Sequence, residues 1–333
     1  MENPINTPAR NPRAEKGEAE YTRSLAGYES LEGEAALVGR SQRMVLKLTG
    51  KDPVGMLNAI LTNEVPKVGN VGAYAALLNA KGRIQTDVRV LKWADEVFID
   101  TEPEGARVAR EILGRYALFS RVKVEDLSDA ETPWTVLGLY GPRAEGLLGG
   151  LRLAEHETAR IEVGEAILLA AGVAVPVAGF DLVGPEDALR HAREYLIKAG
   201  AKPANPDAYE TARIAAGIPR FGVDITPENF PAEAGILERA VSFSKGCYPG
   251  QETVARMRYR GHPNKTLHRL AIQGPPPAPG TPIVQDEKQV GKITSTAPLP
   301  VNGRYPALGY LSRNAQKDAP LSAGEAAVFL APP

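Results

Sequence analysis

The stretch from residue 263 to 333 constrains the fold most, because proline and glycine cut it into segments too short for ordinary helices. Segments such as LHRLAIQG, TPIVQ, QVGKITSTA and YPALGYLS alternate apolar and polar residues, as half-buried strands do. Many short strands separated by turns are typical of a small barrel or sandwich. The sequence therefore predicts one all-β domain over residues 263–333.

Upstream of residue 263, strand and helix patterns recur without the regular alternation of a parallel sheet. Residues 73–93 predict a hairpin that turns at Lys81-Gly82, since apolar and polar residues alternate after the turn. Met56, Leu57 and Ile60 show helical spacing. A chain of 333 residues is too long for one ordinary core. We therefore expect an α+β fold with antiparallel sheets in more than one domain.

The composition is that of a packed globular protein, with 43% hydrophobic residues, 24% charged residues and a net charge of −1. Such a balance gives no global attraction to nucleic acid, so we expect no stable nucleic-acid binding. The polar N-terminus contains no apolar stretch for a signal peptide, and no run is long enough for a membrane span. We expect a cytoplasmic protein with a disordered tail over residues 1–22, a main region over 23–262 and the all-β domain over 263–333.

The chain contains a single cysteine, Cys247. One cysteine excludes an intrachain disulfide, a zinc site built from several thiolates and a self-contained iron–sulfur cluster. The four histidines are scattered and form no metal-binding pair on a helix face. The sequence therefore predicts no metal site within the protein.

The surroundings of Cys247 favour a reactive thiol. Tyr248-Pro249-Gly250-Gln251 fits a type II turn, and GQETVARMR after it predicts a short helix. A position just before a helix N-terminus, near the positive charge of Lys245, favours the thiolate. The alternative interpretation is that Cys247 is a small buried hydrophobic residue with a structural role. The local sequence alone favours neither interpretation over the other. For the basic run ARMRYRGHPNK, a solvated face is the favoured interpretation over a polyanion contact.

The segment KGCYPGQE resembles the K-G-C-Y-x-G-Q-E signature of the YgfZ-type folate-binding family. That family is related to the aminomethyltransferase of the glycine cleavage system and includes a mitochondrial iron–sulfur assembly factor. The resemblance spans roughly residues 25–330. Further landmarks occur in the expected order: LTNEV, LLNAKGRIQTDVRV, LYGPRA, GFDL, RIAAGIPRFGVDI and VGKITSTA.

The resemblance implies two interleaved folate-binding domains with antiparallel sheets, a C-terminal β-barrel and a central pocket for tetrahydrofolate or a one-carbon derivative. It implies catalytic roles for Cys247 and Asp87. It also implies that five residues bind the cofactor: Asp181, Arg213, Lys245, Tyr248 and Gln251.

Some positions depart from the aminomethyltransferase pattern. A paired Asp-Asp is Thr86-Asp87 here, and the glutamate of an R-x-E-A-G motif is Ala215. Asp181 replaces a glutamate that binds the amidine-like edge of the pterin, and it is one methylene shorter. Arg213 matches an arginine that either binds a folate carboxylate or forms a structural ion pair; the pocket role is the favoured one.

The resemblance implies two functions. The first is a tetrahydrofolate-binding protein that supports assembly or repair of iron–sulfur proteins, including tRNA-modifying enzymes, with Cys247 as the reactive group. The alternative is a folate-dependent aminomethyltransferase. The cysteine signature and the missing carboxylates at Thr86 and Ala215 favour the first, because folate methylene transfer needs acid–base and positioning groups rather than a thiol. A scaffold that binds folate without chemistry is a third possibility.

Overall fold

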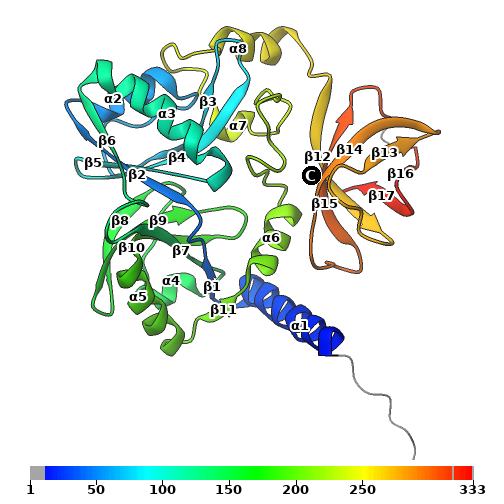
Figure 1. Ribbon diagram of the computed structural model, residues 1–333, viewed down its shortest axis with the longest axis horizontal. Helices are drawn as coiled ribbons and strands as arrows, with labels where there is room; N and C mark the ends of the chain where they lie inside the picture. Colours follow the sequence, from blue (N-terminus) through cyan, green and yellow to red (C-terminus); the bar gives the residue numbers. More distant parts are fainter. Residues whose placement is uncertain (1–11, 317–318, 332–333) are drawn as a thin grey trace, which may run out of the picture.

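The computed structural model describes residues 12–316 and 319–331, and Figure 1 shows two sheets with their helices beside a C-terminal barrel. The predicted α+β class is confirmed. Almost every pair of neighbouring strands is antiparallel, as expected. The exception is β1 with β11, which pair in parallel.

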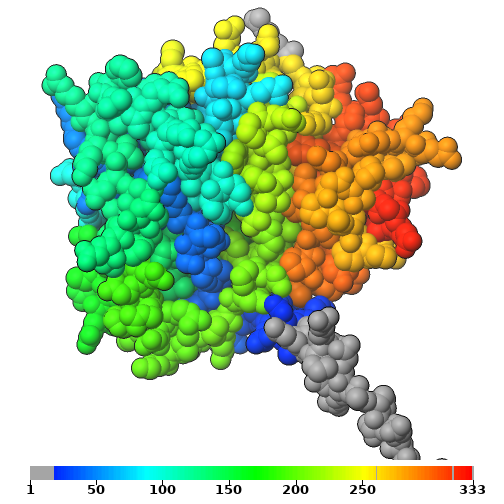
Figure 2. Space-filling model, in the orientation of Figure 1, coloured from blue at the N-terminus to red at the C-terminus, as the bar shows by residue number. Residues whose placement is uncertain are grey.

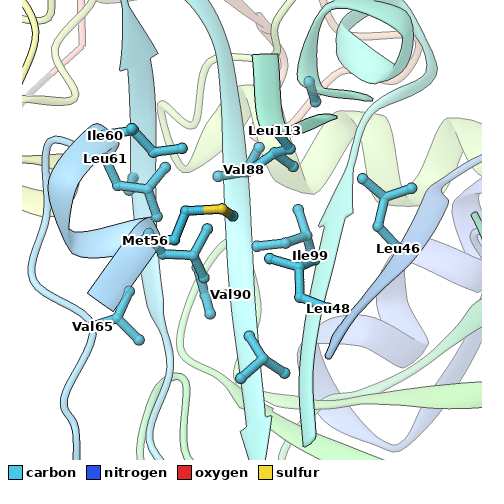
Figure 3. Close-up of a cluster of buried hydrophobic side chains, with 14 of the residues drawn as sticks. Leu46, Leu48, Met56, Ile60, Leu61, Val65, Val88, Val90, Ile99 and Leu113 are labelled. Carbon is cyan, nitrogen blue, oxygen red and sulfur yellow. The ribbon is translucent and has the colours of Figure 1, made fainter. Parts of the chain in front are cut away.

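The first sheet comes from one continuous part of the chain, and its strands lie in the order β3-β4-β5-β2-β6. Their bounds are β2 (Met44–Gly50), β3 (Ala73–Leu78), β4 (Ile84–Trp93), β5 (Glu96–Thr101) and β6 (Val122–Asp126). Helices α2 (Pro53–Ile60) and α3 (Pro103–Ser120) cover one face. Figure 3 shows Met56 of α2 and Leu113 of α3 in the core of that face, with Val88 of β4.

The predicted hairpin is β3 and β4, and the alternation of β4 decides which residues can form a site. Val88 and Val90 point into the core under the helices, because alternate side chains of a strand lie on opposite faces. Asp87 and Arg89 therefore lie on the other face of the sheet. Gly82 adopts φ +80° at the turn, a left-handed conformation that suits glycine.

The second sheet has the order β11-β1-β7-β10-β9-β8. Its strands are β1 (Ala36–Gly39), β7 (Trp134–Tyr140), β8 (Thr158–Val163), β9 (Ala166–Val173), β10 (Gly179–Pro185) and β11 (Lys202–Ala204). Helices α4 (Ala144–Leu147) and α5 (Glu186–Lys198) pack on it. Since β1 precedes the whole first sheet in the chain and β7 to β11 follow it, the two domains are interleaved.

The two sheets pack on each other through an apolar layer to which both contribute. Val45 and Phe98 of the first sheet meet Val136 and Leu169 of the second in this layer. Phe98 also stacks on Trp134, with ring centroids 5.4 Å apart. This packing brings the polar face of β4 close to the second sheet.

The C-terminal domain is a closed barrel with the strand order β12-β15-β14-β13-β16-β17. Its strands are β12 (Lys265–Gln273), β13 (Pro282–Gln285), β14 (Lys288–Thr296), β15 (Tyr305–Ser312), β16 (Leu321–Ala323) and β17 (Ala326–Leu330). Figure 2 shows the barrel, in orange and red, against the yellow-green segment that follows the second sheet. The predicted all-β domain is therefore confirmed as a barrel.

Four further helices complete the fold: α1 (Pro12–Gly33), α6 (Pro206–Ala215), α7 (Leu237–Ala240) and α8 (Gln251–Arg260). α1 differs from the predicted disordered tail, because residues 12–22 are helical. Leu31, in the last part of α1, is fully buried in a cluster with Ala208 and Ala212 of α6, and this contact anchors the helix. Residues 1–11 of the predicted tail lie outside the described residues. None of the described helices has the length and apolar character needed to cross a membrane.

Candidate functional site

A cavity of about 500 Å³ lies where the two sheets meet the segment around α6. Its wall includes the β1–β2 connection, the polar face of the β3–β4 hairpin, residues 155–156, the second sheet, residues 206–220 and Arg239 of α7. The volume is in the range of small-molecule sites. Of the site residues that the sequence predicts, Asp87, Asp181 and Arg213 line this cavity. Cys247, Lys245, Tyr248 and Gln251 are not among its lining residues.

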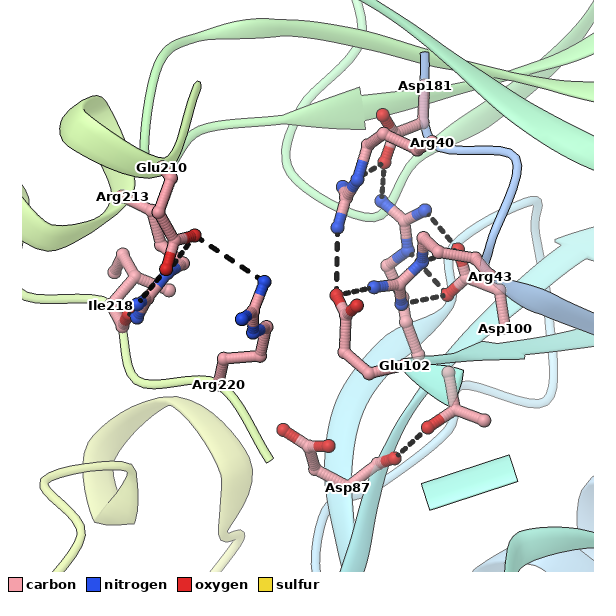
Figure 4. A network of polar contacts seen from close by, with 12 residues as sticks. Arg40, Arg43, Asp87, Asp100, Glu102, Asp181, Glu210, Arg213, Ile218 and Arg220 are labelled. Carbon is pink, nitrogen blue, oxygen red and sulfur yellow. Dashed lines mark hydrogen bonds and ion pairs between the residues drawn. The ribbon is translucent and has the colours of Figure 1, made fainter. Parts of the chain in front are cut away.

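Asp87 is one of the acids that line the cavity. Burial raises its pKa to about 6, although the Tyr74 hydroxyl, which donates to Oδ2 at 2.7 Å, lowers it in part. Figure 4 shows the carboxylate pointing into the space between two polar networks. An acid with this pKa is poised to hold or accept a proton near neutral pH.

The first network fixes the side of the cavity behind Asp87. Arg43 and Arg89 both bind the fully buried carboxylate of Asp100, at 2.5–3.1 Å. Burial alone would raise the pKa of Asp100, but the two guanidinium groups hold it well below its usual range. Glu102 accepts hydrogen bonds from Arg40 and Arg43. These arginines are therefore neutralised by the protein itself.

Asp181 belongs to the same network and is fully buried. Arg89 lies 2.5 Å and Arg40 3.4 Å from its Oδ2, and the Tyr140 hydroxyl donates to Oδ1. Burial would raise the pKa of Asp181, yet Arg89 and Arg40 lower it overall. With three donors from the protein already bound, Asp181 is better placed to hold the wall together than to bind a pterin.

Arg213 has a more complete set of partners. Its five N–H groups donate to the side chains of Glu210, Asp224 and Ser295 and to the carbonyl of Ile218, at 2.5–3.2 Å. A guanidinium has five N–H donors, so none is left for a ligand. Ser295 belongs to the barrel, and Asp224 also accepts from Thr294 of the barrel. Of the two predicted roles for Arg213, these contacts favour the structural ion pair.

Two of the departures from the aminomethyltransferase pattern, at Thr86 and Ala215, lie outside the cavity wall. Thr86 points away from the cavity toward α3, where a Cβ on Gly105 would lie 2.0 Å from its hydroxyl. Ala215 ends α6 and does not line the cavity. Thr86 and Ala215 therefore do not contact a ligand bound in the cavity.

Sequence reasoning missed two polar groups of the cavity wall. The Nε atom of Arg220 and the Nδ1 atom of His156 are buried and have no hydrogen-bond partner in the described structure. Burial lowers the pKa of His156 to about 4, so its imidazole is neutral. Neither residue carries a motif signal. Arg220 lies in the segment RIAAGIPRFGVDI, but the lack of a hydrogen-bond partner for its Nε atom is visible only in three dimensions.

The Cys247 loop, residues 242–250, lies at the other end of the β3–β4 hairpin. The predicted turn is confirmed: Gly250 has φ +82°, and the Gln251 N–H donates to the Tyr248 carbonyl at 3.3 Å. A Cβ on Gly250 would lie 2.7 Å from the Cα of Gly82, so the loop sits directly on the hairpin turn. From Gly82 to Asp87 the chain runs five residues, or roughly 16 Å of extended strand.

Cys247 is exposed, whereas its neighbours in the signature have structural contacts. The ammonium of Lys245 donates to the carbonyls of Asn58 and Leu61 at the end of α2, at 2.8 and 2.5 Å. Burial lowers the pKa of Lys245 to about 8. Tyr248 is buried in an apolar cluster under the hairpin, and Gln251 begins α8. The predicted cofactor contacts of these three residues stay predictions.

Within residues 12–316 and 319–331, no group of three or more potential ligands is arranged to hold a metal ion. The polar groups of the cavity instead suit an organic molecule with hydrogen-bond donors and a negative charge. Asp87 would accept the donors, and Arg220 would bind the anion.

Comparison with known families agrees with this geometry. Residues 21–245 match the family described as "GCVT N-terminal domain", and residues 264–333 match "CAF17, C-terminal beta-barrel domain". The chain belongs to this family of folate-binding proteins, so the resemblance in the sequence is confirmed.

Individual relatives bear two kinds of name. An aminomethyltransferase of Thermus thermophilus is 28% identical over 281 residues, covering 80% of this chain and 76% of the relative. The tRNA-modifying protein YgfZ of Vibrio vulnificus is 28% identical over 252 residues, covering 74% and 73%. The crystal structure of the aminomethyltransferase T of Bartonella henselae has a TM-score of 0.81 at 20% identity, over 93% of this chain and 88% of that one. That structure supports the fold.

Proposed function

We propose that the protein binds tetrahydrofolate, or a one-carbon derivative, in the cavity and supports the assembly or repair of iron–sulfur proteins, including tRNA-modifying enzymes. The exposed Cys247 is the reactive group of this function. The observation that carries the proposal is the combination of a cavity in a GCVT-type domain with a CAF17-type barrel and the KGCYPGQE signature.

The cavity residues fit a folate. Its pterin ring carries adjacent N–H donors, and the ionised Asp87 is a suitable acceptor for them. The orphaned Arg220 Nε and His156 Nδ1 supply further polar contacts in the wall. Bound tetrahydrofolate supplies a carrier for one-carbon units. Since the ionised form of Asp87 is the acceptor, affinity should fall as the pH drops below about 6.

The thiol lies on the surface and not in the cavity wall, so it is open to a partner protein. Cys247 could donate one thiolate to a cluster beside the ligands of a partner. It could instead attack a disulfide of a partner and release one partner cysteine as a thiolate; a second thiol then resolves the mixed disulfide and regenerates the Cys247 thiol. The proposal places the protein in the cytoplasm, where a lone exposed thiol stays reduced.

The experiment compares variants in a host that lacks the endogenous gene. Cys247→Ser should fold normally but fail to restore the activity of iron–sulfur enzymes. Ser244→Ala, a change at another exposed position of the same loop, should restore it and serves as the control. Full rescue by Cys247→Ser would remove the thiol from the function.

An aminomethyltransferase is the second candidate, and Asp87 is the observation that favours it. A buried carboxylate with a pKa of about 6, facing the cavity, suits proton transfer during a one-carbon reaction. Purified protein incubated with tetrahydrofolate and aminomethyl-lipoyl carrier would form methylenetetrahydrofolate and ammonia if this candidate is right. Product formation that Asp87→Asn abolishes and Cys247→Ser leaves intact would establish it over the first.

A further inference from the structure

The cavity contains six arginines, and one of them lacks the partners that the others have. Arg40, Arg43 and Arg89 are bound to buried carboxylates. Arg213 uses all five donors, as described above. The remaining two, Arg220 and Arg239, have about a third of the side chain exposed.

Arg239 also has partners. Its Nη2 atom donates to Glu155 at 2.6 Å, and its guanidinium lies 5.3 Å from the centre of the Tyr74 ring. The one ion pair of Arg220 in the described residues is with Glu210 at 3.6 Å, beyond hydrogen-bond distance. Glu210 is itself held by Arg213 at 2.7 and 2.9 Å. Arg220 is therefore the cation of the cavity that the protein neutralises least.

The backbone holds Arg220 in a fixed place. Its N–H donates to Oδ2 of Asp224 at 3.1 Å, and its carbonyl accepts from the N–H groups of Asp224 and Ile225 at 2.8 and 3.1 Å. Asp224 is in turn anchored to the barrel through Thr294 and Ser295. Figure 4 shows the Arg220 guanidinium in the gap between the two networks, across from Glu102. These contacts fix the backbone from which the Arg220 side chain enters the cavity.

The depths of the polar groups indicate how a ligand is oriented. Asp87 is 8% exposed, whereas the side chain of Arg220 is 33% exposed. A ligand with its donors at Asp87 therefore presents its anionic end at Arg220, nearer to solvent. In tetrahydrofolate the pterin carries the donors, and the carboxylates of the glutamate tail carry the charge.

We propose that Arg220 binds a carboxylate of the glutamate tail and makes the cavity selective for tetrahydrofolate over tetrahydropteroate, which lacks the glutamate. This inference rests on the proposed folate binding. The motif arginine of the family pattern, Arg213, is occupied, so Arg220 takes the role of ligand-binding cation in this chain.

The test is calorimetric titration of the full-length protein with tetrahydrofolate and with tetrahydropteroate under anaerobic conditions. The wild type should bind tetrahydrofolate about 10- to 100-fold more tightly, as expected for one charge-assisted hydrogen-bonded pair. In Arg220→Gln the ratio should fall to within about threefold. Arg220→Lys should keep part of the preference. Arg193→Gln, an exposed arginine on α5 away from the cavity, should behave as wild type.

The outcomes separate this inference from the proposed function. Equal binding of both ligands by the wild type would overturn the role of Arg220 and leave folate binding intact. A preference that survives Arg220→Gln would assign the carboxylate to another residue. If neither ligand binds, the inference and the folate proposal both fail. Equal melting temperatures of the variants are required for each comparison.

Discussion

The cavity and the Cys247 loop differ in almost every physical respect. In the cavity wall, buried arginines and carboxylates neutralise one another, and few polar groups are left for a ligand. In the Cys247 loop, Gly250 packs on the hairpin turn and Lys245 binds carbonyls at the end of α2, while the thiol is exposed. The two regions share the hairpin of β3 and β4, whose ends they occupy. The proposed folate site and the proposed reactive thiol are therefore separate in space.

The largest effect should come from the part of the cavity that we regard as structural. Arg213→Met would leave Asp224, which is 1% exposed, without its buried cation. Breaking one side of a buried ion pair costs about 3–5 kcal/mol, so the free energy of unfolding should drop by that amount. Urea denaturation measures it. A loss below about 1 kcal/mol would mean that Arg213 is available for a ligand after all.

Substitution of Asp87 should raise the free energy of unfolding at neutral pH, in contrast to substitution of Arg213. The reason is that burial of Asp87 destabilises its ionised form. The pKa of Asp87 is about 6 in the folded state, above its value in the unfolded state. The protonated carboxyl therefore favours the folded state below pH ~4, and this stabilisation is lost as the pH rises through 6. Asp87→Asn does not titrate. The stability of the variant relative to wild type should therefore rise by up to about 3 kcal/mol between pH 4 and 7.

The matching measurement on Asp87→Asn is the affinity for tetrahydrofolate at pH 7, which should fall although the protein is more stable. A stability difference that does not change with pH would show that Asp87 titrates normally. Tyr74→Phe is a useful partner variant, since it removes the hydroxyl that donates to Asp87 and should raise the pKa of the carboxyl further.

A smaller effect is expected where the Cys247 loop contacts the hairpin. In Gly250→Ala, the added Cβ would lie 2.6 Å from the carbonyl oxygen of Asn79, and alanine is strained at φ +82°. The variant should lose about 1–3 kcal/mol of stability. If the two regions are independent, its affinity for tetrahydrofolate should change less than twofold. A tenfold loss of tetrahydrofolate affinity would show that the Cys247 loop and the cavity are coupled.

Cys247→Ser should have the smallest effect on the isolated protein. Because the thiol is exposed and outside the cavity wall, the melting temperature and the folate affinity should both stay at the wild-type values. Thermal denaturation and titration with tetrahydrofolate check this. A clear destabilisation would support the alternative that Cys247 is a structural residue.

Much of the fold could be predicted from local patterns. The alternation in residues 84–93 placed Asp87 on a polar face, and the turn chemistry of Pro249-Gly250 placed a positive φ at the correct residue. The barrel followed from short alternating segments. α1 was missed because its anchor, Leu31, is buried against α6, about 180 residues away in the sequence.

The site was harder to predict, because pairing depends on residues that are distant in sequence. Asp181 and Arg213 have the side chains that a folate site needs. Asp181 is bound by the distant Arg89, and Arg213 by the nearby Glu210 and Asp224 and by the distant Ser295. Arg220 lies within a family landmark segment that assigns it no role, and it is distinguished by an Nε atom without a hydrogen-bond partner. The family signature identified the protein class, whereas the availability of each group required the structure.

The most direct test that the cavity and the Cys247 thiol are separate sites is to alkylate Cys247 with iodoacetamide and to measure tetrahydrofolate binding before and after. The account predicts that the modified protein binds tetrahydrofolate with a Kd within about twofold of the unmodified protein. It also predicts that saturating tetrahydrofolate leaves the alkylation rate unchanged. A tenfold loss of affinity after modification, or strong protection of the thiol by the ligand, would contradict the account by placing Cys247 at the bound folate.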